Sequence, residues 1–259
     1  MLTLGRSIGK KVLFFFKEIG NLSILLLHLI QSTPYVLKHR HLVLDQMMKI
    51  GVQSMPLITV MSLFTGAVSS WQASYQFRMI AGFSSVNFLG AAVSAAILIE
   101  LAPVLGGIVI AGRSGASIAA ELGTMKVTEQ IDALETLSID PIRYLAAPRF
   151  TAGWIMLPVL VIYSDFISHL GAYVVAYALL GISTAKFFGS VQRHFLIYNV
   201  FSGVIKAVVF GGGTSLIGCS IGFRTEGGAE GVGFSTIRAF VYSSAFILIM
   251  DYILATILF

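Results

Sequence analysis

The sequence has little charge and almost no cysteine. Only 11% of its 259 residues are Asp, Glu, Lys or Arg, whereas 56% are hydrophobic. Since a soluble domain carries roughly 25% charged residues, this shortage excludes an ordinary soluble fold. The single cysteine, Cys219, lies in an apolar run, which excludes a disulfide framework and indicates a small packing residue. Long apolar runs without the alternation of strands predict spanning helices and not a barrel.

Motifs of catalysis, nucleotide binding and metal binding are also missing. The sequence contains no Gly-x-Ser-x-Gly, no His-Glu-x-x-His and no cluster of Cys and His. The glycine-rich segment 226–233 lacks the Gly-Lys-Ser/Thr ending of a phosphate loop, so we expect a tight turn there. His39 and His41 stand among basic residues, which is typical of a solvated surface. We therefore predict that the chain is not an enzyme and binds no metal or cofactor.

Five apolar segments are long enough to cross a bilayer, for which a helix needs about 20 residues. Several contain proline or glycine, which membrane helices tolerate because neighbouring helices satisfy the freed backbone groups. The sequence therefore predicts an all-α integral membrane protein with about five transmembrane helices. We expect these helices near residues 51–74, 86–111, 151–180, 200–221 and 239–259.

The first 50 residues differ from the rest of the chain. We predict an amphipathic, interfacial N-terminal segment over residues 1–50 and a transmembrane domain over residues 51–259. In residues 1–20, apolar residues share one helical face and cations another, as in a helix lying among lipid headgroups. The apolar run 22–30 is too short to span, so residues 21–50 are expected to form a second interfacial or re-entrant element.

Lysine and arginine are unevenly distributed between the two sides of the membrane. Seven lie in residues 1–50, four in residues 112–149 and two in residues 222–238. The loops on the opposite side hold only Arg78, Lys186 and Arg193. Because cytoplasmic loops carry the excess of these residues, we predict a cytoplasmic N-terminus and a C-terminus on the other side.

The segment 112–149 is the longest amphipathic and charged stretch between the predicted spans. It holds five of the chain's 12 acidic residues: Glu121, Glu129, Asp132, Glu135 and Asp140. Apolar residues recur at spacings of three and four, which predicts helices. We expect a first short helix closed by Gly123, a second near residues 128–137, and a third starting at Asp140 and Pro141. A folded loop of this kind favours contact with a partner.

Four ionisable residues lie in or near the predicted spans: Glu100, Asp165, Lys206 and Asp251. Such residues are costly in hydrocarbon, so they are expected to pair or to face a hydrated cavity. For Glu100 and Lys206, a role in transport and a buried ion pair that only fixes helix register both remain open. For Asp165 and Asp251, a position near an interface, within reach of water, is the favoured interpretation.

A series of short motifs extends in a fixed order through most of the chain after about Gly51. These motifs are Ala-Gly-Arg-Ser-Gly at 111–115, Ala-Glu-Leu-Gly at 120–123, Met125, Thr-Glu-Gln-Ile-Asp-Ala-Leu at 128–134, Asp140-Pro141, Pro148-Arg149, Gly-Gly-Ala-Glu-Gly-Val-Gly at 227–233, Asp251-Tyr252 and Thr-Ile-Leu-Phe at 256–259. In these residues the chain resembles the MlaE permease family, the membrane subunit of bacterial lipid-transporting ABC systems. Some relatives place an arginine before the glutamate, where this chain has Ile99, so Glu100 must find its cation elsewhere.

The resemblance implies a permease that moves phospholipid between the bacterial inner membrane and a periplasmic MCE-type carrier, a process tied to outer-membrane lipid asymmetry. Two copies are expected to associate, and each to dock a cytoplasmic ABC ATPase that binds the ATP and magnesium. No nucleic acid partner is expected. The residues expected to meet the ATPase are Glu121, Glu129, Ile131, Asp132 and Leu134. The residues expected along the lipid path are Glu100, Lys206, Asp251, Leu57, Val60, Leu63, Ile97, Tyr242 and Phe246.

Two other functions remain open at this point. An ion- or proton-coupled secondary transporter would use Glu100, Lys206 and Asp251 and would need no ATPase. A membrane scaffold that transports nothing would tolerate loss of all three. Because related proteins also occur in the chloroplast envelope, the resemblance leaves the source membrane open, as it does the transport direction and the preferred headgroup.

Overall fold

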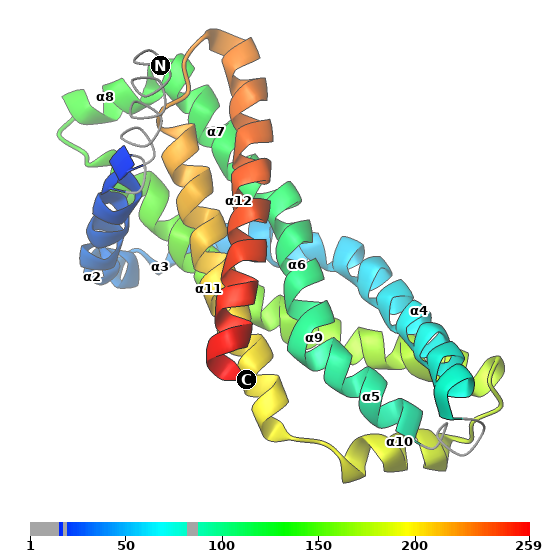
Figure 1. The fold of residues 1–259 in the computed structure, drawn as a ribbon. Helices are drawn as coiled ribbons and strands as arrows, with labels where there is room; N and C mark the ends of the chain where they lie inside the picture. The colour runs from blue at the N-terminus through cyan, green and yellow to red at the C-terminus, as the bar shows by residue number, and fades with distance from the viewer. Residues whose placement is uncertain (1–15, 18–19, 82–87) are drawn as a thin grey trace, which may run out of the picture.

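The computed structural model describes residues 16–17, 20–81 and 88–259, which form helices joined by short turns (Figure 1). These described residues contain no strand, and five of their helical segments are long and apolar enough to cross a membrane. The segments are Arg40–Met79, Leu89–Val127, Ile142–Ala178, Ile197–Gly222 and Gly228–Leu258. The predicted fold class, an all-α membrane protein with about five spans, is confirmed.

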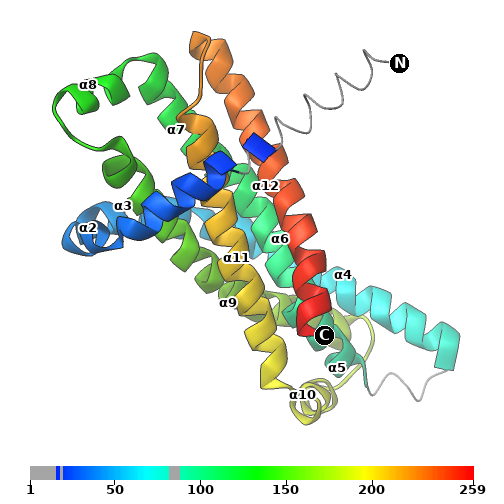
Figure 2. The ribbon, with the colours of Figure 1, turned by 60° about the vertical axis from the view of Figure 1, so that its left-hand side comes forward.

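The described helices are, in chain order, α2 (Thr33–Lys38), α3 (Arg40–Ile50), α4 (Met55–Ala81), α5 (Leu89–Ala96), α6 (Ala102–Ile110), α7 (Ala116–Val127), α8 (Gln130–Thr136), α9 (Ala147–Ala178), α10 (Thr184–Arg193), α11 (Ile197–Gly222) and α12 (Gly228–Leu258). At one end of the molecule α7, α11 and α12 run side by side, with α8 at the tip (Figure 1). At the other end α4, α5 and α9 extend away from them toward α10, as the turned view in Figure 2 also shows.

The N-terminal helices pack against the membrane-spanning part of the chain. A helix over Gly20–Gln31 precedes α2 and extends only about 18 Å, so it is too short to span a bilayer. Residues 40–50 belong to the first candidate span, Arg40–Met79, so the interfacial or re-entrant placement predicted for residues 21–50 stays a prediction. The helix predicted over residues 1–20 lies almost wholly outside the described residues. One buried cluster joins this segment to the second and third spans; among its members are Leu29, Val36, Val43, Ile50, Ile118, Leu122 and Leu145.

Two glycines allow α4 and α9 to pack with their backbones in contact. A side chain on Gly66 would collide with the backbone of Ser168, and one on Gly171 would collide with the backbone of Leu63. Small residues at such crossings are typical of membrane helices, which associate through close packing. This crossing fixes where the apolar surface of α4 lies relative to the rest of the molecule.

The second span continues well beyond its predicted end at residue 111. A single helical segment covers Leu89–Val127, and it includes α5, α6 and α7 with two π-helical stretches, Ile97–Leu101 and Ala111–Gly115. The prediction of a separate short helix closed by Gly123 is therefore wrong. That glycine lies inside α7, where Ile118 and Leu122 are buried against α11 and α12, so tertiary packing outweighs the modest cost of glycine in a helix.

After α7 the chain forms the short helix α8 and then enters the third span. Glu129 before α8 and Ser138 after it have positive φ angles of 59° and 58°. Asp140 accepts a hydrogen bond through Oδ1 from the backbone N–H of Ile142 at 2.9 Å, which caps the next helix. The predicted helix start at Asp140 and Pro141 is confirmed, but this helix runs through a π-helical stretch, Ile142–Ala146, directly into α9.

The remaining elements include one that the sequence did not predict. Helix α10 lies between the third and fourth spans and packs against α5, where Ser190 Oγ accepts a hydrogen bond from the N–H of Ala91 at 3.2 Å. The glycine-rich segment 226–233 forms a turn only at its start. Gly227 and Gly228 have φ angles of 88° and 64°, and α12 begins at Gly228.

Candidate functional site: a buried lysine shared by three spans

Lys206, a fully buried lysine of α11, joins three membrane helices. Its Nζ lies 2.6 Å from Oε1 of Glu100 in the second span and 2.8 Å from Oδ1 of Asp251 in α12. Because a charge in hydrocarbon is costly unless it is paired, an ammonium group without solvent contact needs these carboxylates. Of the two environments expected for Glu100 and Lys206, a partner or a hydrated cavity, the structure shows a partner: the two residues pair with each other, and Asp251 joins them.

Glu100 lies in a π-helical stretch, which explains how it reaches Lys206. The stretch Ile97–Leu101 ends just before Pro103, in the first turn of α6. Proline has no N–H and its ring clashes with the carbonyl four residues earlier, so the helix deviates from regular α geometry at this point. A single π turn changes which residues face a given neighbour, and such turns are frequent at functional sites. Here the turn carries Glu100, one of the two carboxylates that pair with Lys206.

The three charged side chains differ sharply in exposure. The side chain of Lys206 is 0% exposed, that of Asp251 is 20% exposed and that of Glu100 is 42% exposed. Glu100 therefore opens onto the surface of the single chain, within a span. Because hydrocarbon does not solvate a carboxylate, this surface requires a hydrated cavity or another polar group beside it. The cluster thus has a buried side, held by Lys206, and an open side at Glu100.

The apolar residues predicted for the lipid path occupy different environments. Leu57, Val60 and Leu63 are exposed on α4, and Tyr242 is exposed on α12. Two members are less accessible. Phe246 packs against Gly213 of α11, and Ile97 is fully buried in a core cluster. Contact with lipid stays a prediction for each of them.

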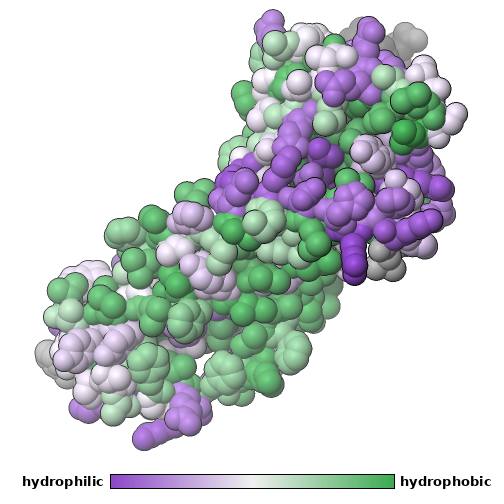
Figure 3. Space-filling view, turned by 180° about the vertical axis from the view of Figure 1, so that it is seen from behind, coloured by the Kyte–Doolittle hydropathy of each residue, from purple (hydrophilic) through white to green (hydrophobic). Residues whose placement is uncertain are grey.

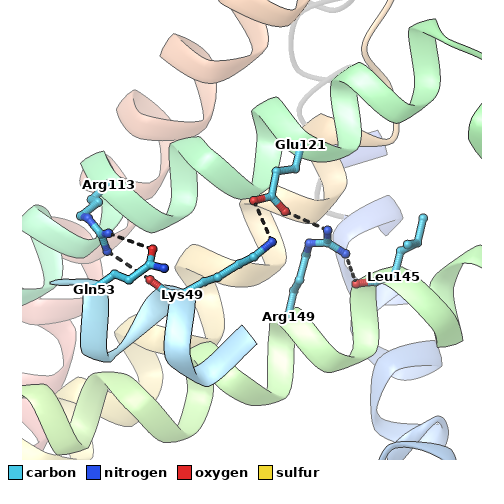
Figure 4. A network of polar contacts seen from close by, with 6 residues as sticks. All are labelled: Lys49, Gln53, Arg113, Glu121, Leu145 and Arg149. Atoms are coloured by element: carbon cyan, nitrogen blue, oxygen red, sulfur yellow. Dashed lines mark hydrogen bonds and ion pairs between the residues drawn. The ribbon is translucent and has the colours of Figure 1, made fainter. Parts of the chain in front are cut away.

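A second charged network lies where α3, α7 and α9 meet (Figure 4). Glu121 on α7 accepts a hydrogen bond from Nη2 of Arg149 at 2.9 Å, and its other oxygen lies 3.5 Å from Nζ of Lys49 on α3. Arg149 is almost fully buried and also donates from Nη1 to the carbonyl oxygen of Leu145 at 2.8 Å. The network therefore ties the N-terminal helices to the second and third spans.

Arg113 extends this network toward the start of α4. It lies in the second π-helical stretch, Ala111–Gly115, and donates from Nη1 to the carbonyl oxygen of Lys49 at 3.2 Å. It also contacts Oγ of Ser54 and, at 3.5 Å, Oε1 of Gln53. Both π-helical stretches of the second span therefore present an ionised side chain to a neighbouring helix.

Comparison with known proteins identifies the family. The sequence model of the family described as Permease MlaE matches residues 43–257, which is most of the chain. The chain belongs to the MlaE permease family. It is 38% identical to a probable ABC transporter permease protein of Rickettsia typhi over 100% of this chain and 99% of the relative. It is 40% identical to a probable ABC transporter permease protein of Synechocystis over 90% and 86% of the two chains.

A third relative carries a more specific name. The chain is 35% identical to the intermembrane phospholipid transport system permease protein MlaE of Haemophilus influenzae, over 98% of this chain and 96% of the relative. The MlaE family resemblance raised the question of which cation pairs with Glu100, because Ile99 replaces the arginine of some relatives. The structure answers that Lys206, 106 residues further along the chain, supplies the cation.

Of the residues predicted to meet an ATPase, Glu121 lies on α7 and pairs with Arg149 and Lys49, whereas the other four lie around α8 and do not all face outward. Glu129 is exposed, and Asp132 is half exposed and pairs with Lys126 at 2.7 Å. Ile131 is buried in the protein's own core, and Leu134 packs against the same core. In this MlaE-family chain, the acidic side of α8 is therefore available to a partner, whereas Ile131 already serves to hold α8 in place.

Sequence reasoning missed several residues of these sites. Leu137, at the end of α8, is 70% exposed, although its helical spacing placed it on the apolar face. The roles of Arg113 and Arg149 were also missed. Both lie in stretches that match the family, 111–115 and 148–149, and this match could have pointed to a role for the two arginines. An arginine in a glycine-rich, apolar stretch is costly without partners, and this observation alone would have justified a search for them.

Asp165 contrasts with the Lys206 cluster. It is 8% exposed in the middle of α9, so the structure does not place it near water as the sequence suggested. Its Oδ1 has no hydrogen-bond partner among the described residues. Neighbouring polar groups are occupied with each other, since Ser164 and Ser62 form a hydrogen bond of 2.7 Å and His169 bonds Ser94 at 2.8 Å. Asp165 is thus a buried acid with no cationic partner among the described residues.

Proposed function

We propose that this protein is the permease subunit of an ABC-type lipid transporter. It moves phospholipid between the inner membrane and an MCE-type carrier, and a partner ATPase supplies the energy. The name of the Haemophilus relative supports phospholipid as the cargo, and the names of the other relatives support an ABC system. No step of bond chemistry is assigned to this chain.

The observation that carries this proposal is the open side of the Lys206 cluster. A path for a phospholipid must be apolar for the acyl chains and must offer very few polar groups for the headgroup. Glu100 is the exposed member of the Lys206 cluster, and the exposed surfaces of the spans are otherwise largely apolar. Lys206 is already shared by two carboxylates, so a lipid phosphate can reach it only where Glu100 moves aside. We therefore assign Lys206 to the headgroup and Glu100 to the opening of the site.

Reconstitution with the ATPase and carrier tests this assignment. In Lys206→Met, copurified phospholipid should fall strongly, because the cation that receives the phosphate is gone. In Glu100→Gln, phospholipid should remain bound while ATP hydrolysis no longer drives its transfer. Lys186→Met on α10 is the matched control, since this lysine is exposed and lies outside the cluster. Wild-type lipid content and transfer in both variants would overturn the assignment.

The same reconstituted system distinguishes the ABC permease from a secondary transporter and from a membrane scaffold. A secondary transporter would move its substrate when only an ion or proton gradient is applied, with no ATPase present. A scaffold would tolerate neutralisation of Glu100, Lys206 and Asp251 together without any change in lipid transfer. Transfer that requires ATP and is lost on neutralisation supports the ABC permease alone.

The ATPase is proposed to dock on the acidic side and tip of α8. Glu129 and Asp132 supply negative charge, and the exposed Leu137 supplies an apolar anchor. Reversing both charges, or changing Leu137→Asp, should release the ATPase while the permease stays folded. Leu196→Asp, at a residue that is 61% exposed outside this segment, is the matched control. Normal copurification of the ATPase with both α8 variants would place the docking surface elsewhere.

A homodimer is proposed through α12. Only 11% of the most apolar window of this helix is buried inside the single chain, so most of its side chains are left for lipid or a second copy. Disulfide formation between single cysteines introduced along α12, in a Cys219→Ala background, would map such an interface. Cross-linking with helical periodicity supports the dimer, and no cross-link at any position contradicts it.

The proposed orientation places α8 in the cytoplasm and the C-terminus in the periplasm. It rests on the excess of lysine and arginine at the α8 end. In the same Cys219→Ala background, cysteines at Gly227 and Phe259 flank α12 and should react with a membrane-impermeant reagent from opposite sides. Labelling of both from one side would contradict the orientation.

A further inference from the structure

A polar pocket lies between α3, the turn after it and the second span. Its volume is about 290 Å³, and Arg113, Ser114, Lys49, Gln53 and Glu121 are among its lining residues. It is separate from the Lys206 cluster, because Arg113 follows Glu100 along one helix by about 20 Å. The pocket has room for about ten water molecules, which suits a small polar group and not an acyl chain.

The depth of this pocket matches the headgroup region of a bilayer. From Leu89 at the start of the second span to Arg113 the helix rises about 36 Å, which exceeds the roughly 30 Å of the hydrocarbon core. In Figure 3, a hydrophilic band crosses the molecule between a large apolar body and the α8 end. A pocket at this level is within reach of the headgroups of one leaflet.

The charges around the pocket leave cations in excess. The network in Figure 4 contains Arg113, Lys49 and Arg149 but one carboxylate, Glu121. Glu121 is held most closely by Arg149, at 2.9 Å, and lies 3.5 Å from Lys49. The positive charges of Arg113 and Lys49 are therefore only partly compensated by the protein, which favours an anion in the pocket.

Two kinds of hydrogen-bond donor are still available to such an anion. A guanidinium has five N–H donors, and the contacts of Arg113 to Lys49, Ser54 and Gln53 leave some of them free. Those contacts also hold the guanidinium in one place, which lowers the entropic cost of binding a ligand. Ser114 lines the pocket, is 5% exposed, and has no hydrogen-bond partner for Oγ among the described residues.

We propose that this pocket binds the phosphate group of a membrane phospholipid from the leaflet at the α8 end. Arg113 and Ser114 donate hydrogen bonds to the phosphate oxygens, and Lys49 contributes a mobile positive charge. The acyl chains then extend over the exposed apolar side chains of Val52 and Leu57, which follow Lys49 in the chain. This inference concerns lipid held by the chain itself and does not depend on transport.

Lipid binding to the purified full-length protein in detergent tests the proposal by native mass spectrometry. The probes are dioleoylphosphatidylglycerol, dioleoylphosphatidylethanolamine and dioleoylglycerol, the last of which lacks a phosphate. Both phospholipids should bind, and dioleoylglycerol should not. Arg113→Gln should weaken phospholipid binding about tenfold, as expected for loss of a charge-assisted hydrogen bond. Arg193→Gln on α10 is the control and should bind as the wild type does.

Further variants distinguish a ligand site from a structural one. Ser114→Ala removes only an unpartnered hydroxyl, so it should weaken binding without lowering the melting temperature. Glu121→Gln removes a negative charge and should bind phospholipid at least as tightly as the wild type, whereas a site that is merely disrupted would bind less. If inorganic phosphate displaces the lipid at equal concentration, the pocket is a site for free phosphate, and the lipid assignment is wrong.

Failure of this proposal can be told apart from failure of the transport proposal. Lys206→Met should keep lipid at the α8-end pocket while it loses lipid at the cluster, so one of two bound lipids should remain. Wild-type phospholipid binding in both Arg113→Gln and Ser114→Ala would overturn the proposal for the pocket alone.

Discussion

The second span carries two charged clusters that differ in their surroundings. At Glu100, inside the membrane part, the cation Lys206 is fully buried and its partners come from two other helices. At Glu121, toward the α8 end, one cation is buried and the other, Lys49, is 51% exposed. Charges that water or headgroups can reach need their protein partners less, because the solvent compensates for a lost contact. The same kind of ion pair should therefore contribute very differently at the two places.

The largest effect is expected from Lys206→Met. This change leaves Glu100 and Asp251 facing each other without a cation, and removal of one partner from a buried pair typically costs about 3–5 kcal/mol. The apparent free energy of unfolding in mild detergent should fall by this amount. The triple variant Lys206→Met, Glu100→Gln, Asp251→Asn should recover most of the loss, since no charge is then left unpaired. A triple variant as unstable as the single one would show that packing of Lys206, and not its charge, matters.

A smaller effect is expected from Arg149→Met at the α8-end network. This residue is almost fully buried and makes two hydrogen bonds, one of them with the carboxylate of Glu121. Glu121 keeps Lys49 as a partner, so the loss should be about 1.5–3 kcal/mol. Thermal melts should show a clear decrease that is smaller than that of Lys206→Met. An equal or larger decrease would contradict the distinction between the two clusters.

The smallest loss is expected from Lys49→Gln. This side chain is half exposed, its nitrogen lies 3.5 Å from Glu121, and exposed ion pairs contribute about 0–1 kcal/mol. The effect of this change should shrink further as salt rises, because salt screens exposed charges. Melts of the variant and the wild type at low and high salt measure both points. A salt-independent loss above that range would mean that Lys49 acts as a buried charge.

Asp165 extends the comparison because it is buried and has no cationic partner in the part of the chain that the structure describes. Asp165→Asn keeps the shape of the side chain and replaces an acid for which the described residues offer no cation, so stability should stay within about 1 kcal/mol of the wild type. Asp251→Asn, which removes a partner of Lys206, should destabilise. If the two variants lose stability equally, then burial alone, and not pairing, decides the cost of a carboxylate in this protein.

The sequence allowed some of this architecture to be predicted. Composition and apolar run lengths predicted the five spans, and the cost of charge in hydrocarbon correctly singled out Glu100 and Lys206 as partners or cavity residues. The pairing of the third member, Asp251, with Lys206 was not predicted, because run length gives a residue's depth but not the direction in which its side chain points. Helix α10 was missed, since it is too short and too polar to stand out among apolar runs.

The two π-helical stretches and the extent of the second span are beyond what periodicity can predict. Gly123 and the charged residues after Arg113 are typical of a helix end, yet burial of Ile118 and Leu122 keeps the chain helical. In the same way, the apolar face of α8 was correctly expected, but Ile131 turned inward and Leu137 outward. Local patterns identify an apolar face, whereas the choice between the protein's own core and a partner depends on tertiary contacts.

The uninterrupted second span has a mechanical consequence. From Leu89 to Val127 it forms a rod about 57 Å long, with Glu100 near one end and Glu121 near the other. A tilt of about 5° moves one tip by about 5 Å relative to the other, as the rise per residue dictates. Helices α6 and α7 join Glu100 to Glu121, and the two residues lie about 32 Å apart along the segment by the rise per residue. Lys206 and Arg149 therefore hold one helical segment at two levels, so a displacement of this segment alters both ion pairs.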